Sequence, residues 1–70
     1  MWILTKEKLP DMAKPVLVYN PERQRIFEAE IQPINIEMSL FNWWIARGSM
    51  WFSLESCPLW MPFPDIPKYV

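Results

Sequence analysis

Histidine is absent from this sequence, and cysteine occurs once, at Cys57. Zinc and most transition-metal sites are built from histidines and clustered cysteines, so the sequence predicts no metal site and no cofactor. A nucleophilic cysteine needs a neighbouring base or cation that lowers its pKa. We find no such group and expect Cys57 to be a buried apolar residue. The protein is accordingly predicted not to be an enzyme.

Glycine is nearly absent as well, with Gly48 as its single example. Phosphate-binding loops depend on several glycines for close backbone approach, so this class of site is excluded. Two acidic residues, Glu28 and Glu30, would lie about 7 Å apart on one face of a strand, a separation that glycosidases use. A general acid also needs an apolar pocket. An alternating strand face does not provide one, and we expect both carboxylates to be solvated.

Neither sign of charge dominates, since seven basic and eight acidic side chains give a net charge of −1. Nucleic-acid binding calls for a concentrated basic surface, so nucleic acid is not an expected partner. No segment approaches the roughly 20 apolar residues of a membrane span, and charged residues occupy the place of a signal-peptide core. An unpaired cysteine is typical of a reducing compartment. These features predict a cytoplasmic protein with no membrane partner.

Eight prolines divide the chain and exclude long helices almost everywhere outside residues 34–57. Residues 16–19, the run VLVY, contain no polar alternation, which is typical of a strand that is covered on both faces and central in its sheet. Residues 26–31 alternate between apolar and acidic side chains, which predicts a half-exposed strand. The turn-forming residues 20–22 between them favour a hairpin.

The middle of the chain permits two interpretations. Residues 34–48 can form a helix capped by Asn35 and ended by Gly48, although that helix would be apolar nearly all round. Alternatively, residues 40–46 and 50–54 pair as a hairpin about residues 47–49. We favour the hairpin because aromatic residues and isoleucine are better strand formers than helix formers. The last segment, residues 57–69, contains four prolines and is expected to be an edge strand or an extended arm.

The predicted fold is therefore mainly β, with a small α+β fold as the variant. Residues 1–70 form a single small domain, because nothing in the sequence divides them. We expect a compact antiparallel sheet of three to four strands, an extended proline-rich C-terminal arm, and at most one or two short helices.

Three sequence elements follow one another in a recognisable order. They are Trp2 with Leu9-Pro10, then Val16-Leu17-Val18-Tyr19, then Trp60-Met61-Pro62-Phe63-Pro64-Asp65-Ile66-Pro67-Lys68. Together they resemble a family known as domain of unknown function number 551, found in tailed phages and enterobacterial prophages. Residues 32–56 have no counterpart in that pattern, and Leu59 stands where members commonly carry a histidine. The family has no established activity, so the resemblance implies a phage or prophage origin and a compact fold, and no mechanism.

Aromatic residues and methionines are abundant, with five tryptophans, four phenylalanines and five methionines in so short a chain. They either build a dense small core or leave part of their surface exposed as a patch, and such residues are enriched at binding surfaces. The patch is expected within residues 38–52, and its candidate partner-binding residues are Met38, Phe41, Trp43, Trp44, Met50 and Trp51.

The function predicted from these features is that of a small phage or prophage accessory protein that binds another protein stoichiometrically. Its partner would be a host or phage protein, and the binding would inhibit a host enzyme or a defence complex. The alternative is a self-associating structural or virion-linked component, which would use the same surface to form a homodimer.

Overall fold

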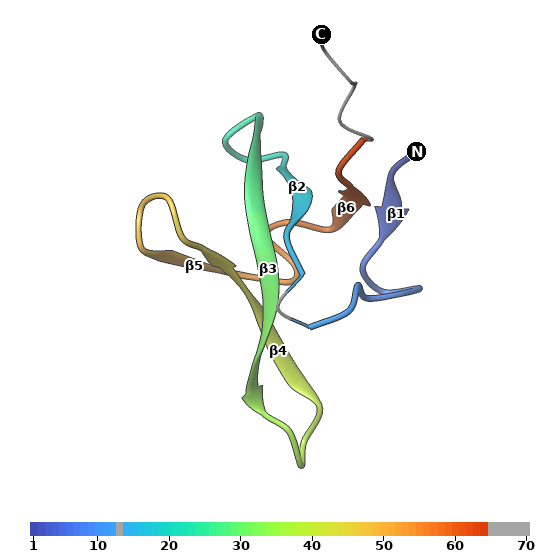
Figure 1. Cartoon of the computed structure of the whole chain (residues 1–70), viewed down its shortest axis with the longest axis vertical. Helices are drawn as coiled ribbons and strands as arrows, with labels where there is room; N and C mark the ends of the chain where they lie inside the picture. The colour runs from blue at the N-terminus through green and yellow to red at the C-terminus, as the bar shows by residue number, and fades with distance from the viewer. Residues whose placement is uncertain (13, 65–70) are drawn as a thin grey trace, which may run out of the picture.

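The described part of the chain, residues 1–12 and 14–64 of the computed structural model, consists of strands and turns (Figure 1). Its six strands are β1 (Ile3–Leu4), β2 (Val16–Asn20), β3 (Arg25–Asn35), β4 (Leu40–Ile45), β5 (Met50–Ser53) and β6 (Leu59–Pro62). The mainly β class is confirmed. The expected count of three to four strands is wrong, and no helix occurs in these residues. No helix that could span a membrane is accordingly found among them.

All strand pairs are antiparallel, and the strands lie in the order β1-β6-β2-β3-β4-β5. The central position predicted for residues 16–19 is confirmed, because β2 lies between β6 and β3. Strand β2 is fully covered on one face and partly covered on the other. Val16 and Val18 are fully buried, whereas Leu17 and Tyr19 on the other face are half-buried.

The expectation of an edge strand or arm for the C-terminal segment is wrong for β6. This strand lies inside the sheet and pairs with β1 on one side and with β2 on the other. It tolerates this position because prolines occur only before it, at Pro58, and at its last residue, Pro62. Its middle residues therefore keep the backbone N–H groups that both neighbours need. Residues 65–70, the rest of the expected arm, lie outside the described residues.

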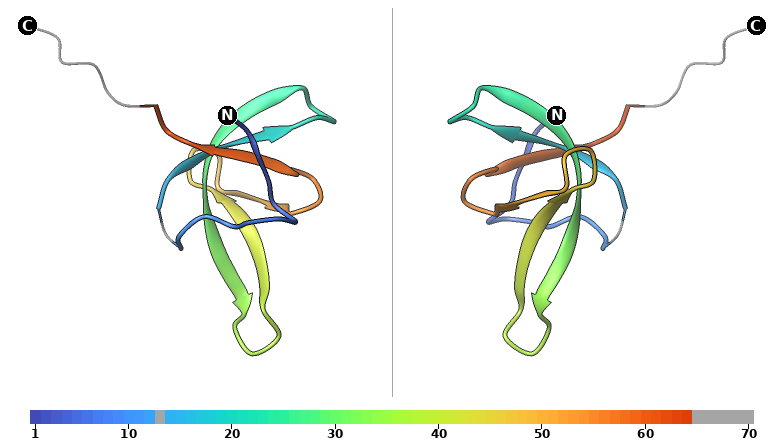
Figure 2. Two further views of the ribbon diagram at one scale, coloured as in Figure 1. Left: turned by 90° about the vertical axis from the view of Figure 1, so that its right-hand side faces the viewer. Right: turned by 90° about the vertical axis from the view of Figure 1, so that its left-hand side faces the viewer.

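Strand β3 is shared between two halves of the sheet. Its first part, from Arg25 to Ala29, pairs with β2, and its second part, from Glu30 to Asn35, pairs with β4. The chain bends where the pairing changes, so that β4 and β5 turn across the other strands (Figure 2). The inner faces of the two halves meet at Phe27 and Phe52, whose rings lie edge to face with centroids 5.2 Å apart.

The three hairpins found in the described residues use similar tight turns, at residues 21–24, 36–39 and 46–49. Each turn ends on a residue in the left-handed backbone region, with φ of 54° at Gln24, 53° at Ser39 and 49° at Ser49. Asparagines stabilise the first two turns from the end of the preceding strand. Asn20 Oδ1 accepts a hydrogen bond from the backbone N–H of Arg23, and Asn35 Oδ1 accepts one from that of Met38.

The middle of the chain forms the favoured hairpin and not the helix. Strand β4 pairs with β5 in a continuous register from Ile45 opposite Met50 to Asn42 opposite Ser53. Gly48 lies in the turn between them with φ of 138°, a conformation that other residues rarely adopt. The glycine that would have ended a helix therefore closes a hairpin.

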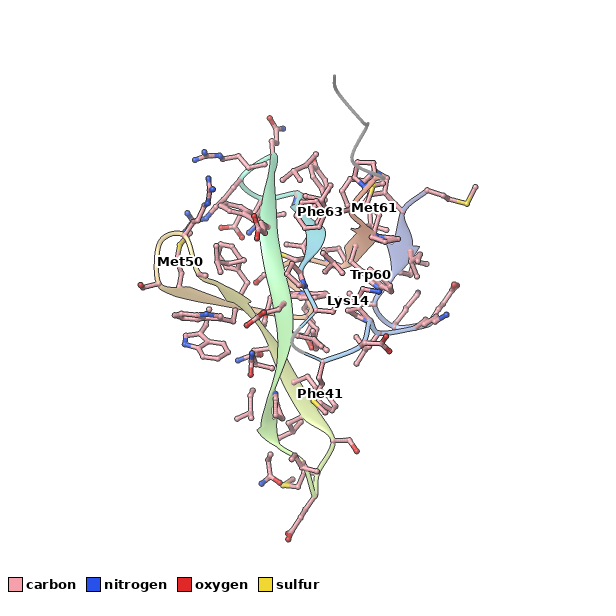
Figure 3. The ribbon with its side chains drawn as sticks, viewed as in Figure 1. Lys14, Phe41, Met50, Trp60, Met61 and Phe63 are labelled. Atoms are coloured by element: carbon pink, nitrogen blue, oxygen red, sulfur yellow. The ribbon has the colours of Figure 1, made fainter. Side chains whose placement is uncertain are left out.

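The core lies between the two halves of the sheet, and Trp43 is its largest fully buried side chain. Ile31, Trp43 and Phe52 lie opposite one another on three adjacent strands. The indole N–H of Trp43 donates a hydrogen bond of 3.1 Å to the carbonyl oxygen of Cys57. The other buried indole, that of Trp60 on β6 (Figure 3), donates in the same way to the carbonyl of Lys8, at 2.8 Å. Each buried indole thus has its one polar group satisfied.

We expect Trp43→Phe to lower the free energy of unfolding by about 2 kcal/mol or more, because it leaves a cavity and an unpaired buried carbonyl at Cys57. The same substitution at the exposed Trp51 should cost less than about 0.5 kcal/mol. Urea denaturation followed by far-ultraviolet circular dichroism measures both. Equal losses in the two variants would show that Trp43 is not the central core residue.

Candidate functional site

Two tryptophans on the outer face of the β4–β5 hairpin form the centre of the candidate site. Successive side chains of a strand point to opposite faces, so the inward Trp43 leaves Trp44 pointing outward. Trp44 lies opposite Trp51 of β5, and their ring centroids are 4.8 Å apart. Trp44 is half-buried, whereas Trp51 is 53% exposed. The pair presents indole surface to solvent.

Aliphatic side chains continue this surface along β3 and β4. The pairing register of these strands shifts between Pro33 and Asn35, and Ile34, within this irregular stretch, is exposed. Ile34 and Trp51 line one shallow hollow together with Pro33 and Asn42. Leu40, two residues before Asn42 and so on the same face of β4, is also exposed.

The turn between β3 and β4 extends the apolar surface to the end of the hairpin. In every view this turn projects away from the other strands (Figures 1 and 2). Ile36 and Met38 lie in the turn and are exposed. The single charged residue within residues 31–46 is Glu37. The projecting hairpin therefore carries apolar side chains with almost no charge among them.

We name this surface the outer apolar patch, and it consists of Ile34, Ile36, Met38, Leu40, Trp44 and Trp51. All of its members except Trp44 are at least 45% exposed, and a gathering of exposed apolar side chains on a monomeric protein often marks a binding site. Tryptophan at the centre of such a patch is typical of interface hot spots. The patch is suited to excluding water from a contact with another apolar surface.

The six residues predicted from the sequence divide between the two faces. Met38, Trp44 and Trp51 belong to the outer apolar patch. Phe41 and Met50 are half-buried and pack against the core from the two ends of the β4–β5 hairpin (Figure 3). The surface position expected for Trp43 is wrong, because its side chain is fully buried.

Sequence reasoning placed Trp43 and Trp44 on one surface although neighbours in a strand must face opposite sides. It also missed Ile34, Ile36 and Leu40. The sequence feature that could have indicated these three residues is the near absence of charged residues between Ile31 and Ala46, where Glu37 is the exception. The projection of the hairpin beyond the core, which exposes them, is a tertiary feature.

Carboxylates do not gather into a reactive site in the described residues. Glu28 is exposed, and Glu30 Oε1 accepts a hydrogen bond of 2.9 Å from Gln32 Nε2. No group of three or more histidine, cysteine, aspartate or glutamate side chains is placed to hold a metal ion in residues 1–12 and 14–64. A surface hollow of about 430 Å³ lies between β1 and the loop after β5, and the two charged residues at its rim, Lys6 and Glu55, are exposed.

Cys57 is fully buried, as expected from the sequence. Burial raises the pKa of its thiol from 9.0 to about 11, and the positive charge of Arg23 opposes part of this rise. The thiol is therefore protonated at neutral pH and is a poor nucleophile. The carbonyl oxygen of Cys57 accepts the hydrogen bond from the indole N–H of Trp43. Cys57 is therefore a core residue.

Comparison with known proteins finds no relative: no family model, no curated protein and no solved structure matches this chain. The resemblance to the phage family stays a prediction from the sequence. The case for a function rests on the outer apolar patch itself.

The raised pKa of Cys57 predicts a loss of stability at high pH. The unfolded chain releases the thiol proton more easily than the folded one, so the contribution of Cys57 is complete below pH 9 and is lost as pH rises from 9 towards about 11. Urea unfolding between pH 8 and pH 11 should show a steeper decline for the wild type than for Cys57→Ala. Parallel declines would mean that the thiol ionises as freely in the folded protein as in the unfolded chain.

Proposed function

We propose that this protein works by binding another protein through the outer apolar patch. The observation that carries the proposal is the indole pair Trp44–Trp51 on an outer face of the sheet, next to the exposed aliphatic side chains of the β3–β4 hairpin. A folded chain of this size gains stability by burying such rings, and these two are kept at the surface. Their exposure is accounted for if a partner covers them.

The partner surface that fits the patch is apolar and without dense charge. Glu30 lies directly opposite Trp44, and Arg47 lines the same hollow as both residues. Glu37 is the one charged residue between Ile31 and Ala46, so the projecting part of the hairpin offers little to steer a highly charged ligand. The polar side chains of Gln32 and Asn42 lie opposite each other within this face and can exchange hydrogen bonds with a partner backbone. An apolar groove or helix face on a folded protein has this chemistry.

The phage or prophage origin implied by the sequence resemblance favours a host or phage protein as the partner. In this proposal a stoichiometric complex covers a functional surface of a host enzyme or a defence complex and inhibits it. The second candidate function is a self-associating structural component, in which the patch meets the same patch on a second copy. The reducing cytoplasm proposed for the protein suits its one free, buried cysteine.

A matched pair of substitutions on β3 tests the proposal. Ile34, in the patch, is 59% exposed, and Ile26, near the other end of β3, is 56% exposed. Ile34→Asp would bury an unpaired carboxylate in the contact and should weaken partner binding by about 100-fold. Ile26→Asp introduces the same charge outside the patch and should leave binding unchanged. Affinity capture from bacterial lysate, followed by titration of the captured protein, measures both variants.

Circular dichroism and urea denaturation should show that both variants fold like the wild type, because both positions are exposed. The proposal fails if no protein binds saturably at a one-to-one ratio. It also fails if a bound protein is retained equally by Ile34→Asp and Ile26→Asp, since the binding surface then lies elsewhere.

A further inference from the structure

Two exposed arginines lie at the turn between β2 and β3. Arg23 belongs to the turn, and Arg25 is the first residue of β3. The guanidinium carbon of Arg23 is 5.2 Å from the ring centroid of Phe52, and that of Arg25 is 5.6 Å from the ring centroid of Phe27. The two rings are themselves in edge-to-face contact. Both cations are therefore held against one pair of rings, towards the inner face of the sheet.

Asn20 adds a neutral hydrogen-bond donor beside these cations. It lies directly opposite Arg25 in the pairing of β2 with β3, so the two side chains leave the same face with Cβ atoms about 5 Å apart. Only 3% of Asn20 is exposed. Its Oδ1 accepts the backbone N–H of Arg23, which orients the amide, and no acceptor for Nδ2 is found within the described residues. Solvent reaches Nδ2, because no fully buried side-chain polar atom of these residues lacks a partner.

The N–H groups of the two guanidiniums are available as well. A guanidinium carries five N–H donors around its edge, and an aromatic ring offers no lone pair to accept them. In residues 1–12 and 14–64 no ion pair is found, although Glu22 lies in the same turn. Glu28 follows Arg25 by three residues and so points to the opposite face of β3. Two positive charges and an amide donor are thus gathered at one corner of the sheet.

We propose that Asn20, Arg23 and Arg25 bind a phosphate group. Their two positive charges match the charge of about −1.5 to −2 on a phosphate monoester better than the single charge of a carboxylate. Guanidinium forks contact an oxyanion through two N–H groups each, and the amide of Asn20 donates to a further oxygen. The rings hold the guanidiniums in place, so less side-chain entropy is lost on binding. The site consists of side chains and therefore differs from the glycine-rich loops that the sequence excludes.

This site goes beyond the proposed function and lies apart from the outer apolar patch. Arg25 begins β3, whereas Ile34 of the patch is near the other end of this strand. The β2–β3 turn and the projecting β3–β4 turn accordingly lie far apart along the molecule (Figure 1). A small phosphorylated molecule and a phosphorylated side chain of another protein both carry the group that the site would bind.

Titration of the purified protein with inorganic phosphate tests the site. The arginine Nε–H signals are followed by two-dimensional nuclear magnetic resonance while phosphate replaces chloride at constant ionic strength, so that general screening stays the same. We expect saturable shifts at Arg23 and Arg25 with a Kd on the order of 1 mM. Arg47, an exposed arginine of another hairpin turn, should show no comparable shift. Acetate should bind about tenfold more weakly than phosphate.

Substitutions separate the cations from the amide donor. Arg25→Gln should weaken phosphate binding by about tenfold, because it removes one charged fork. Asn20→Asp keeps an oxygen for the Arg23 N–H but replaces the amide donor by a negative charge, and it should weaken binding by about 100-fold. Arg47→Gln is the matched control and should bind like the wild type. Circular dichroism checks the fold of each variant, and Arg25→Gln, at an exposed position, keeps the test valid if Asn20→Asp does not fold.

Shifts that rise linearly with phosphate, or that are as large at Arg47, overturn the proposal, because they show a general attraction of anions only. Acetate that binds as tightly as phosphate overturns it too. Glycerol phosphate and a short phosphoserine peptide, titrated in the same way, distinguish a small molecule from a protein segment as the source of the group, and the tighter ligand identifies that source. Ile34→Asp should bind phosphate like the wild type, so this test and that of the proposed function fail independently.

Discussion

Burial of the Trp43 indole between the two halves of a bent sheet is the contact on which this structure depends. Strand β3 pairs with β2 along its first part and with β4 along its second, and this change of partner brings the halves face to face. A side chain as large as an indole fills the space between them. The hydrogen bond from Trp43 to the carbonyl of Cys57 ties β4 to the segment that leads into β6. A small domain without a disulfide thereby obtains a closed core.

The exposed indoles follow from the buried one. Because neighbouring residues on a strand face opposite sides, an inward Trp43 forces Trp44 outward, and the cross-strand register then places Trp51 against it. The β3–β4 hairpin also extends past the core, so the side chains near its turn have no second layer to cover them. The exposed apolar surface is thus a result of this architecture, and a bound partner would remove it from water.

The two edges of the sheet differ in a way that follows from the chain path. The N-terminal strand β1 is short and its sequence neighbour Trp2 packs near Tyr19, with ring centroids 6.3 Å apart. The opposite edge strand, β5, has four residues and carries Trp51 of the outer apolar patch. Part of the outer apolar patch therefore lies at this edge of the sheet.

The sequence by itself determined the β class and the hairpin of β2 with β3, and it favoured the hairpin of β4 with β5 over a helix, because alternation and turn residues act between near neighbours in the chain. Alternation within a strand also requires Trp43 and Trp44 to face opposite sides, which the assignment of both residues to one surface overlooked. Only the tertiary structure decided that β6 inserts between β1 and β2, since this pairing joins residues as distant as Val16 and Pro62. Likewise, the bend of β3 decided which of the two neighbouring tryptophans is covered, because alternation separates two faces and only packing selects the one that becomes the core.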